Sequence, residues 1–344
     1  MNYFTGSYIV TIIGFILAWF WGEHVNPGTG FMTLFIVMVL AVLEVSLSFD
    51  NAVVNAIKLE KMNEKWRQRF LTWGIAIAVF GMRFLFPVLV VAIFAKLSLL
   101  EVTKIAFTDA LKYAHYLHLT HAPIVAFGGT FLMMLFLSYF FNCDKEVHWI
   151  KPLEKKCCSL GQVKGIETLI TLLALYIVQL NVNTAQALLV VKSGISGIAI
   201  YLLIDGLTHW LEKKEDESTK IISQTVKGSG LVGFLYLELI DASFSLDGVL
   251  GAFALSKDIL IISIGLAIGA MFVRSLTIML VEKKTLGKFI YLEHGAHWAI
   301  GALAAIMLVS TFHEVPEVVT GLIGLAFIVL SLVSSLLHNK KTEP

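Results

Sequence analysis

The segment LEVSLSFDNAVVNA, residues Leu43–Ala56, places two carboxylates, Glu44 and Asp50, inside an otherwise apolar stretch. At the centre of a bilayer an ionised side chain costs about 3 kcal/mol even on a lenient insertion scale. Such groups are therefore rare in spanning helices, and they usually face the bundle interior, where they serve a function. The segment predicts a spanning helix with a buried polar face.

The composition of the whole chain is that of a membrane protein. Of its 344 residues, 57% are hydrophobic and 15% are charged, and the mean hydropathy is +0.81. Soluble domains carry about 25% charged residues. No alternating pattern typical of a membrane barrel is present, so we expect an all-α fold, a polytopic transmembrane helical bundle in the lipid bilayer. The net charge of +1 gives no indication of nucleic acid binding.

Hydropathy predicts about ten spans. Lys and Arg concentrate in every second loop and in the C-terminal tail, which places these regions and both termini on the cytoplasmic side. We therefore expect a multi-pass protein of a cell membrane, most simply the bacterial cytoplasmic membrane. The predicted spans are residues 5–21, 31–57, 70–95, 123–142, 166–181, 185–211, 230–254, 259–281, 295–312 and 316–337.

The first motif occurs a second time in the chain. EVSLSFDNAVV (Glu44–Val54) is matched by DASFSLDGVLG (Asp241–Gly251), and GIAIAVFGMR (Gly74–Arg83) by GLAIGAMFVR (Gly265–Arg274). Two matches in the same order predict an internal repeat. In the expected topology the first motif runs from outside to inside and the second from inside to outside. The repeats are thus inverted, as in many secondary transporters.

This repeat predicts the organisation of the chain as a single integral membrane domain over residues 1–344. Its parts are a first repeat at 31–142, a basic loop with two inserted spans and a second basic loop at 143–229, and a second, inverted repeat with the final helix at 230–337. The outer segment 96–121 should lie at the membrane interface or pack on the outer helix ends.

The spacing of the three cysteines fits no metal site. We expect reduced cytosolic thiols at Cys143, Cys157 and Cys158.

The polar side chains of both motifs define a candidate site. They offer carboxylate, amide and hydroxyl oxygens but no Cys or His, a set that suits hard cations such as Mn²⁺, Ca²⁺ and Mg²⁺. On an ideal helix Glu44 and Asp50 point about 120° apart, so local unwinding or the symmetry-related helix would have to close the site. Expected metal ligands are Glu44, Asp50, Asn51, Asp241 and Asp247, supported by Ser46, Ser48, Arg83, Glu238, Ser243, Ser245 and Arg274.

The acids outnumber the arginines, so we expect a divalent cation as substrate, with proton exchange as a natural coupling and no tightly bound cofactor. Three alternatives remain open. The acids could only brace the bundle, Glu44 or Asp50 bonding Arg83 and Asp241 or Asp247 bonding Arg274. The substrate could be a small organic solute, or the protein could be a non-transporting membrane stress-response protein.

The sequence contains no phosphate loop and no nucleophile elbow, so we do not expect an enzyme.

These ordered motifs resemble the TerC family of integral membrane proteins, which includes the tellurite-resistance and Alx-type proteins. The resemblance rests on SLSFDNAVV (46–54), GIAIAVFGMRFLFP (74–87), FGGTFLM (127–133), DASFSLDGV (241–249) and GLAIGAMFVRSL (265–276). It implies an inverted-repeat bundle that exports a divalent metal, chiefly manganese, with acidic motif residues at Glu44, Asp50, Asp241 and Asp247 and the Asp-Asn step at Asn51. Gly248, where the family usually has Ser, and the additional spans within 150–228 indicate a divergent branch.

Overall fold

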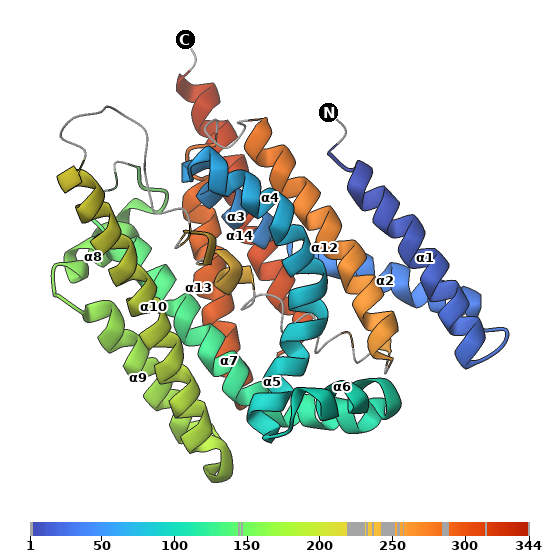
Figure 1. Ribbon diagram of the computed structural model, residues 1–344. Coiled ribbons are helices and arrows are strands. Elements are labelled where there is room, and N and C mark those ends of the chain that lie inside the picture. Colours follow the sequence, from blue (N-terminus) through green and yellow to red (C-terminus); the bar gives the residue numbers. More distant parts are fainter. Residues whose placement is uncertain are drawn as a thin grey trace.

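A computed structural model shows the protein as a bundle of helices (Figure 1). It describes residues 3–143, 145, 147–218, 231, 233–235, 237–241, 252, 255, 256, 258–283, 289–313 and 315–342. Every regular element within these residues is helical, which confirms the all-α class. In chain order the elements are α1 (Thr5–Val25), α2 (Gly30–Leu47), α3 (Phe49–Lys61), α4 (Glu64–Ala76), η1 (Ile77–Leu85), α5 (Phe86–Ala95), α6 (Leu99–Thr108), α7 (Ala110–Phe141), α8 (Lys151–Gly161), α9 (Ile166–Asn181), α10 (Thr184–Ser218), α12 (Ile259–Glu282), α13 (Leu292–Ser310) and α14 (Glu317–Thr342).

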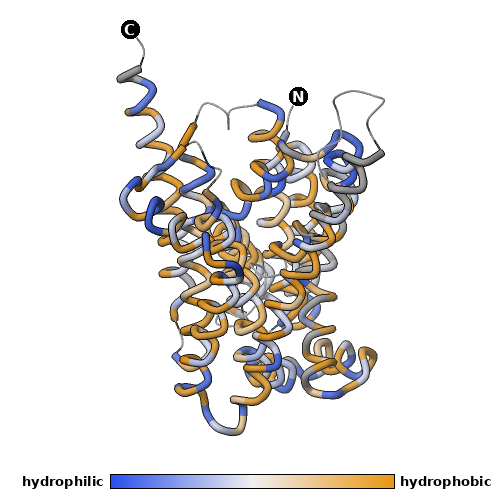
Figure 2. Tube along the Cα trace, turned by 90° about the vertical axis from the view of Figure 1, so that its left-hand side faces the viewer, coloured by the Kyte–Doolittle hydropathy of each residue, from blue (hydrophilic) through white to orange (hydrophobic). Residues whose placement is uncertain are grey.

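Within the described part of the chain, seven helices are long and apolar enough to cross a bilayer, as a polytopic protein requires. Figure 2 shows hydrophobic positions along most of their length and hydrophilic positions gathered toward the two ends of the bundle. These seven segments are α1, α2, residues 111–141 of α7, residues 184–207 of α10, α12, α13 and residues 319–339 of α14.

The other predicted spans take different forms. The second, 31–57, is divided into α2 and α3 at Ser48, and the third, 70–95, is a rod of α4, η1 and α5. The fifth, 166–181, coincides with α9, which has 16 residues and is bent by 101° from α8. Most of the seventh, 230–254, lies outside the described residues. Helix α7 starts at Ala110, well before the predicted residue 123, and continues through Pro123.

The direction of the helices agrees with the expected parity of the spans. Both termini lie at the same end of the bundle, at the top of Figure 1. From that end α4, η1 and α5 run toward the opposite end, whereas α12, which contacts η1, runs back toward it. Helix α6 lies at the opposite end, packed on α5 and α7 with Val102 and Ala106 buried, as expected for the outer segment 96–121.

The expectation of three reduced cysteines was wrong for two of them. Cys143 and Cys158 form a disulfide with their Cα atoms 5.0 Å apart, and Cys157 carries a free thiol. The two partners meet because α8 folds back onto the end of α7, where Gly161 packs directly against the Phe141 carbonyl. A separation of 15 residues does not reveal this return of the chain.

Candidate functional site

The first motif is interrupted by a helix break at Ser48. This residue has φ −102° and ψ 15°, although its amide still donates to the Glu44 carbonyl at 2.9 Å. Asp50 therefore falls in the first turn of α3, where the positive end of the helix dipole stabilises a carboxylate. The break leaves Glu44 and Asp50 on different helices, in contact with different neighbours.

Glu44 forms a buried ion pair with Arg83. Its Oε1 accepts a hydrogen bond from Arg83 Nη2 and another from Ser48 Oγ at 2.9 Å, and only 2% of its side chain is exposed. Arg83 belongs to η1, a π-helical segment whose wider turn is a form often found at functional sites. Helix α12 covers the pair at Gly269, where a Cβ would collide with the Glu44 side chain. This is the arrangement expected of a brace.

Asp50 is buried between α3 and the C-terminal helix α14. Its Oδ1 accepts a hydrogen bond from the Asn51 amide at 2.9 Å, and the residue is 5% exposed. On the other side lies Gly324, where an added Cβ would sit 2.5 Å from Asp50 Oδ2. A glycine is needed here because any side chain would displace the carboxylate or the helix.

Asp241 of the second motif is held by two amides of the first. Asn51 Nδ2 and Asn55 Nδ2 donate to the same oxygen, Asp241 Oδ1, at 2.6 and 2.9 Å. Asp241 lies in the helical residues 237–241, and the bonds join positions 190 and 186 residues apart. The two predicted repeats therefore meet at this carboxylate.

Several buried polar atoms around Asp241 have no hydrogen-bond partner among the described residues. They are Asn51 Oδ1, Asn55 Oδ1, both carboxylate oxygens of Glu238, and Nε and Nη2 of Arg274. All four side chains are at most 8% exposed. Buried polar groups are nearly always satisfied by protein or by water, so these six atoms are candidate contacts for water, an ion or a polar solute.

Arg274 provides the positive charge of this region. Its guanidinium carbon lies 4.5 Å from the centroid of the Phe70 ring, and its charge interacts with those of Asp241 and Glu238. By sequence matching it corresponds to Arg83. The two arginines have different partners, since Arg83 is bonded to the Glu44 carboxylate and Arg274 rests on an aromatic face.

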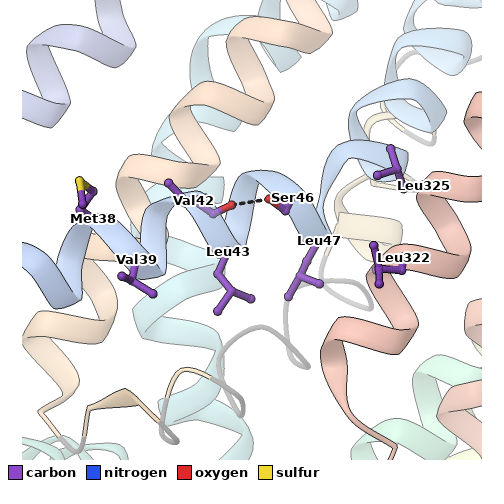
Figure 3. A pocket seen from close by; sticks show the side chains of 9 residues that line it. Met38, Val39, Val42, Leu43, Ser46, Leu47, Leu322 and Leu325 are labelled. Atoms are coloured by element: carbon purple, nitrogen blue, oxygen red, sulfur yellow. Dashed lines mark hydrogen bonds between the residues drawn. The ribbon is translucent and has the colours of Figure 1, made fainter.

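Of the remaining expected residues, Ser46 and Ser48 bond within the first motif's own helices. Ser46 Oγ donates to its own helix at the Val42 carbonyl, 2.8 Å away, and lines an outward-facing apolar groove between α2 and α14 (Figure 3). Ser243, Ser245 and Asp247 lie outside the described residues. Ser48 contacts Glu44 and not Asp241.

No group of three or more His, Cys, Asp or Glu side chains is placed to hold a metal ion in the described part of the structure. The acids lie apart from one another instead. Glu44 is paired with Arg83, and Asp50 packs against α14. Asp241 and Glu238 interact electrostatically with each other and with Arg274. A cation here would need amide oxygens, water or Asp247 as additional ligands. Oxygen ligands of these kinds are what Mn²⁺, Mg²⁺ and Ca²⁺ accept.

A second buried polar cluster lies near the disulfide. Glu154 Oε1 accepts from the Trp149 and Ile150 amides, and its Oε2 is 3.5 Å from His294 Nε2, which contacts the Val147 carbonyl at 2.8 Å. Lys145 Nζ lies 4.2 Å from the Tyr139 ring centroid. Burial lowers the pKa of Lys145, an effect that the charge of Glu154 opposes. This cluster fastens the 142–161 region to α13.

The sequence of the chain matches one known protein family over most of its length. A family described as "Protein of unknown function (DUF475)" matches residues 49–342, which include Asp50, Asn51, Asn55, Asp241 and Arg274. The chain belongs to this family. Its first 48 residues, with Glu44, precede the matched region.

One relative of this DUF475 chain is the "Uncharacterized membrane protein YceF" of Bacillus subtilis (strain 168). The two are 32% identical over 149 residues, which is 42% of this chain and 57% of the relative. The chain thus matches a little more than half of the relative's length. No solved structure matches it. The match to a membrane protein and the seven apolar helices together support a multi-pass membrane protein. Membership of the TerC family is not shown by these matches.

The site also contains residues that sequence reasoning did not select. Asn55 lies one helical turn after Asn51 and, like it, donates a hydrogen bond to Asp241. The i, i+4 spacing of the two asparagines indicates that they share one face of the helix. Gly74 and Gly324 matter because a guanidinium and a carboxylate occupy the space next to them. Such contacts between distant helices leave no local pattern in the sequence.

Proposed function

We propose that this multi-pass DUF475 protein is a transporter, without enzymatic activity, that exports a hard divalent cation, with Mn²⁺ the best single candidate. It would reside in the bacterial cytoplasmic membrane with both termini in the cytoplasm. The cation is the substrate and not a resident cofactor. The resemblance to TerC proteins supports this proposal, as do the oxygen donors that Asn51, Asn55, Glu238 and Asp241 bring to the region.

The observation that carries the proposal is the contact of Asn51 and Asn55 with Asp241. Both amide nitrogens are used on one carboxylate oxygen, so both amide oxygens remain unpartnered and buried in the same region. Carbonyl-type oxygens together with a carboxylate form a shell for a hard cation. The contact also joins the two predicted repeats, and secondary transporters built from inverted repeats bind their substrates at the repeat interface.

The experiment is a transport assay in cells with matched variants. Deletion of the gene should raise the manganese content of the cells, and expression of the wild-type protein should return it to the original level. Asp241→Asn should abolish this rescue, whereas Asp109→Asn, at the exposed N-terminus of α7, should not. Full rescue by Asp241→Asn would contradict the proposed site.

A second candidate function is export of a small zwitterionic solute. The observation that favours it is the presence of unpartnered groups of both signs, Glu238 and Arg274, on one buried region. An ammonium group would bind Glu238 and a carboxylate would bind Arg274. This function predicts that the deletion changes the content of an organic solute and leaves cellular manganese unchanged.

A further inference from the structure

Arg83 and Arg274 occupy matching positions in the two predicted repeats but differ in their bonding. Arg83 is joined to Glu44. For Arg274, neither Nε nor Nη2 has a hydrogen-bond partner among the described residues, although the residue is only 6% exposed. An arginine that merely braced the bundle would be expected to show the first pattern, because a buried charge is stabilised only by paired, hydrogen-bonded partners.

Helix α4 provides a fitted niche for the Arg274 guanidinium. The Phe70 ring lies 4.5 Å from the guanidinium carbon, a distance at which cation–π attraction is effective. One turn later, Gly74 leaves room for it, since a Cβ there would lie 2.6 Å from Nη2 and 3.0 Å from Nη1. The niche holds the guanidinium while Nε and Nη2 have no hydrogen-bond partner among the described residues.

The niche is close to the carboxylates that we propose to attract the substrate. The charge of Arg274 interacts with those of Asp241 and Glu238, and both oxygens of Glu238 lack a hydrogen-bond partner among the described residues. Asp241 already accepts two hydrogen bonds from amides, whereas Glu238 has no such donor among the described residues, so Glu238 is the carboxylate that a cation would pair with. A divalent cation and the guanidinium would both satisfy it, and they repel each other.

We propose that Arg274 is an internal competitor of the transported cation. When the cation is bound, the guanidinium rests on Phe70; when the cation leaves, the guanidinium moves to Glu238 and takes its place. The empty transporter can then return to the side from which it takes up the cation, because the Glu238 carboxylate is paired with Arg274. Net transport therefore needs no second substrate carried in the opposite direction. This inference rests on the proposed function and adds Arg274, Phe70 and Gly74 to it as positioning residues.

The test measures Mn²⁺ binding and two modes of Mn²⁺ transport by the purified full-length protein reconstituted in liposomes. Arg274→Gln should bind Mn²⁺ about tenfold more tightly, because a like charge is removed from the site. Its Mn²⁺/Mn²⁺ exchange should continue, while net efflux into metal-free buffer should fall about tenfold relative to exchange, because the empty carrier no longer has its substitute cation. Arg274→Lys should restore net efflux.

Variants of the niche should act in the opposite direction. Phe70→Leu and Gly74→Ala keep the arginine but remove or fill its resting place, so the guanidinium should spend more time on Glu238 and Mn²⁺ should bind more weakly. If Arg274→Gln does not fold, these two variants carry the test. The double variant Glu44→Gln/Arg83→Gln is the matched control. It removes the other arginine together with its carboxylate partner, so it should not tighten Mn²⁺ binding.

Weaker or unchanged Mn²⁺ binding by Arg274→Gln would overturn the inference, as would tighter binding by Gly74→Ala. Equal loss of exchange and net efflux in Arg274→Gln would also overturn it, since a purely structural arginine gives that result. If the wild-type protein binds Mn²⁺ but its net efflux does not depend on Arg274, the proposed function stands without the competitor. Absence of Mn²⁺ binding by the wild-type protein would overturn both.

Discussion

Asn51 of α3 donates a hydrogen bond of 2.6 Å to Asp241, which lies 190 residues later in the chain. The bond connects the two copies of the acidic motif directly. Around it, Asn55 adds a second donor and the Arg274 guanidinium lies within electrostatic reach. The two motifs therefore meet at Asp241, although their acids do not form a single cluster within the described residues.

Glu44 and Arg83 should behave as a structural pair. Glu44→Gln should destabilise the protein by about 3–5 kcal/mol, because it leaves Arg83 buried without its carboxylate. The double variant Glu44→Gln/Arg83→Gln should recover part of that loss. Thermal unfolding in detergent of the four proteins of this cycle measures the coupling, and strictly additive losses would show that the pair does not brace the bundle.

Gly324 should be required for the approach of α14 to Asp50. Gly324→Ala places a Cβ against Asp50 Oδ2 and should cost about 1–3 kcal/mol of stability. Gly206→Ala in α10 is the control, because nothing lies within 4 Å of the position of its Cβ. That variant should be neutral or slightly more stable. Equal melting temperatures for the two variants would show that α14 does not pack on Asp50 as described.

The disulfide predicts a defined thiol count. In protein purified without reductant, one cysteine of three, Cys157, should react with an alkylating reagent, and all three should react after reduction and unfolding. Cys143→Ser should lower stability by about 3 kcal/mol, as expected for a closed loop of about 15 residues. Three reactive thiols before reduction would contradict the bond between Cys143 and Cys158.

Lys145 should make stability depend on pH. Its folded-state pKa lies below the ordinary value of 10.5 because the side chain is buried, so the unfolded chain binds more protons between those two values. Stability should therefore rise with pH in that interval. Melting temperatures at pH 7 to 10 should increase in the wild-type protein and increase less in Lys145→Met. An identical pH slope in both proteins would exclude this role for Lys145.

Much of the architecture was predictable because hydropathy and Lys and Arg placement respond to the bilayer directly. The all-α class and the parity of the helices follow from these signals, and the acidic motifs pointed to Glu44, Asp50 and Asp241. The break at Ser48 and the π-helical turn that directs Arg83 were not predictable, because packing against other helices determines them.

The details of the site were harder to predict for the same reason. The bracing interpretation expected Glu44 or Asp50 to bond Arg83, and Glu44 is the partner found. For Arg274 it expected Asp241 or Asp247. Asp241 accepts hydrogen bonds from two asparagines, and Asp247 lies outside the described residues. Matching sequence motifs predicted matching partners. The amides of the first motif have no equivalent in the second, where Gly248 and Ala252 align with Asn51 and Asn55. This difference breaks the symmetry.

The most direct test of the central claim is calorimetric binding of Mn²⁺ to the purified wild-type protein, Asp241→Asn and the control Asp109→Asn. If the contact of Asn51 and Asn55 with Asp241 forms part of a cation site, Asp241→Asn should bind Mn²⁺ about 10- to 100-fold more weakly. Asp109→Asn should bind like the wild type. Equal Mn²⁺ affinity of Asp241→Asn and the wild type, or no binding by the wild type, would contradict the account.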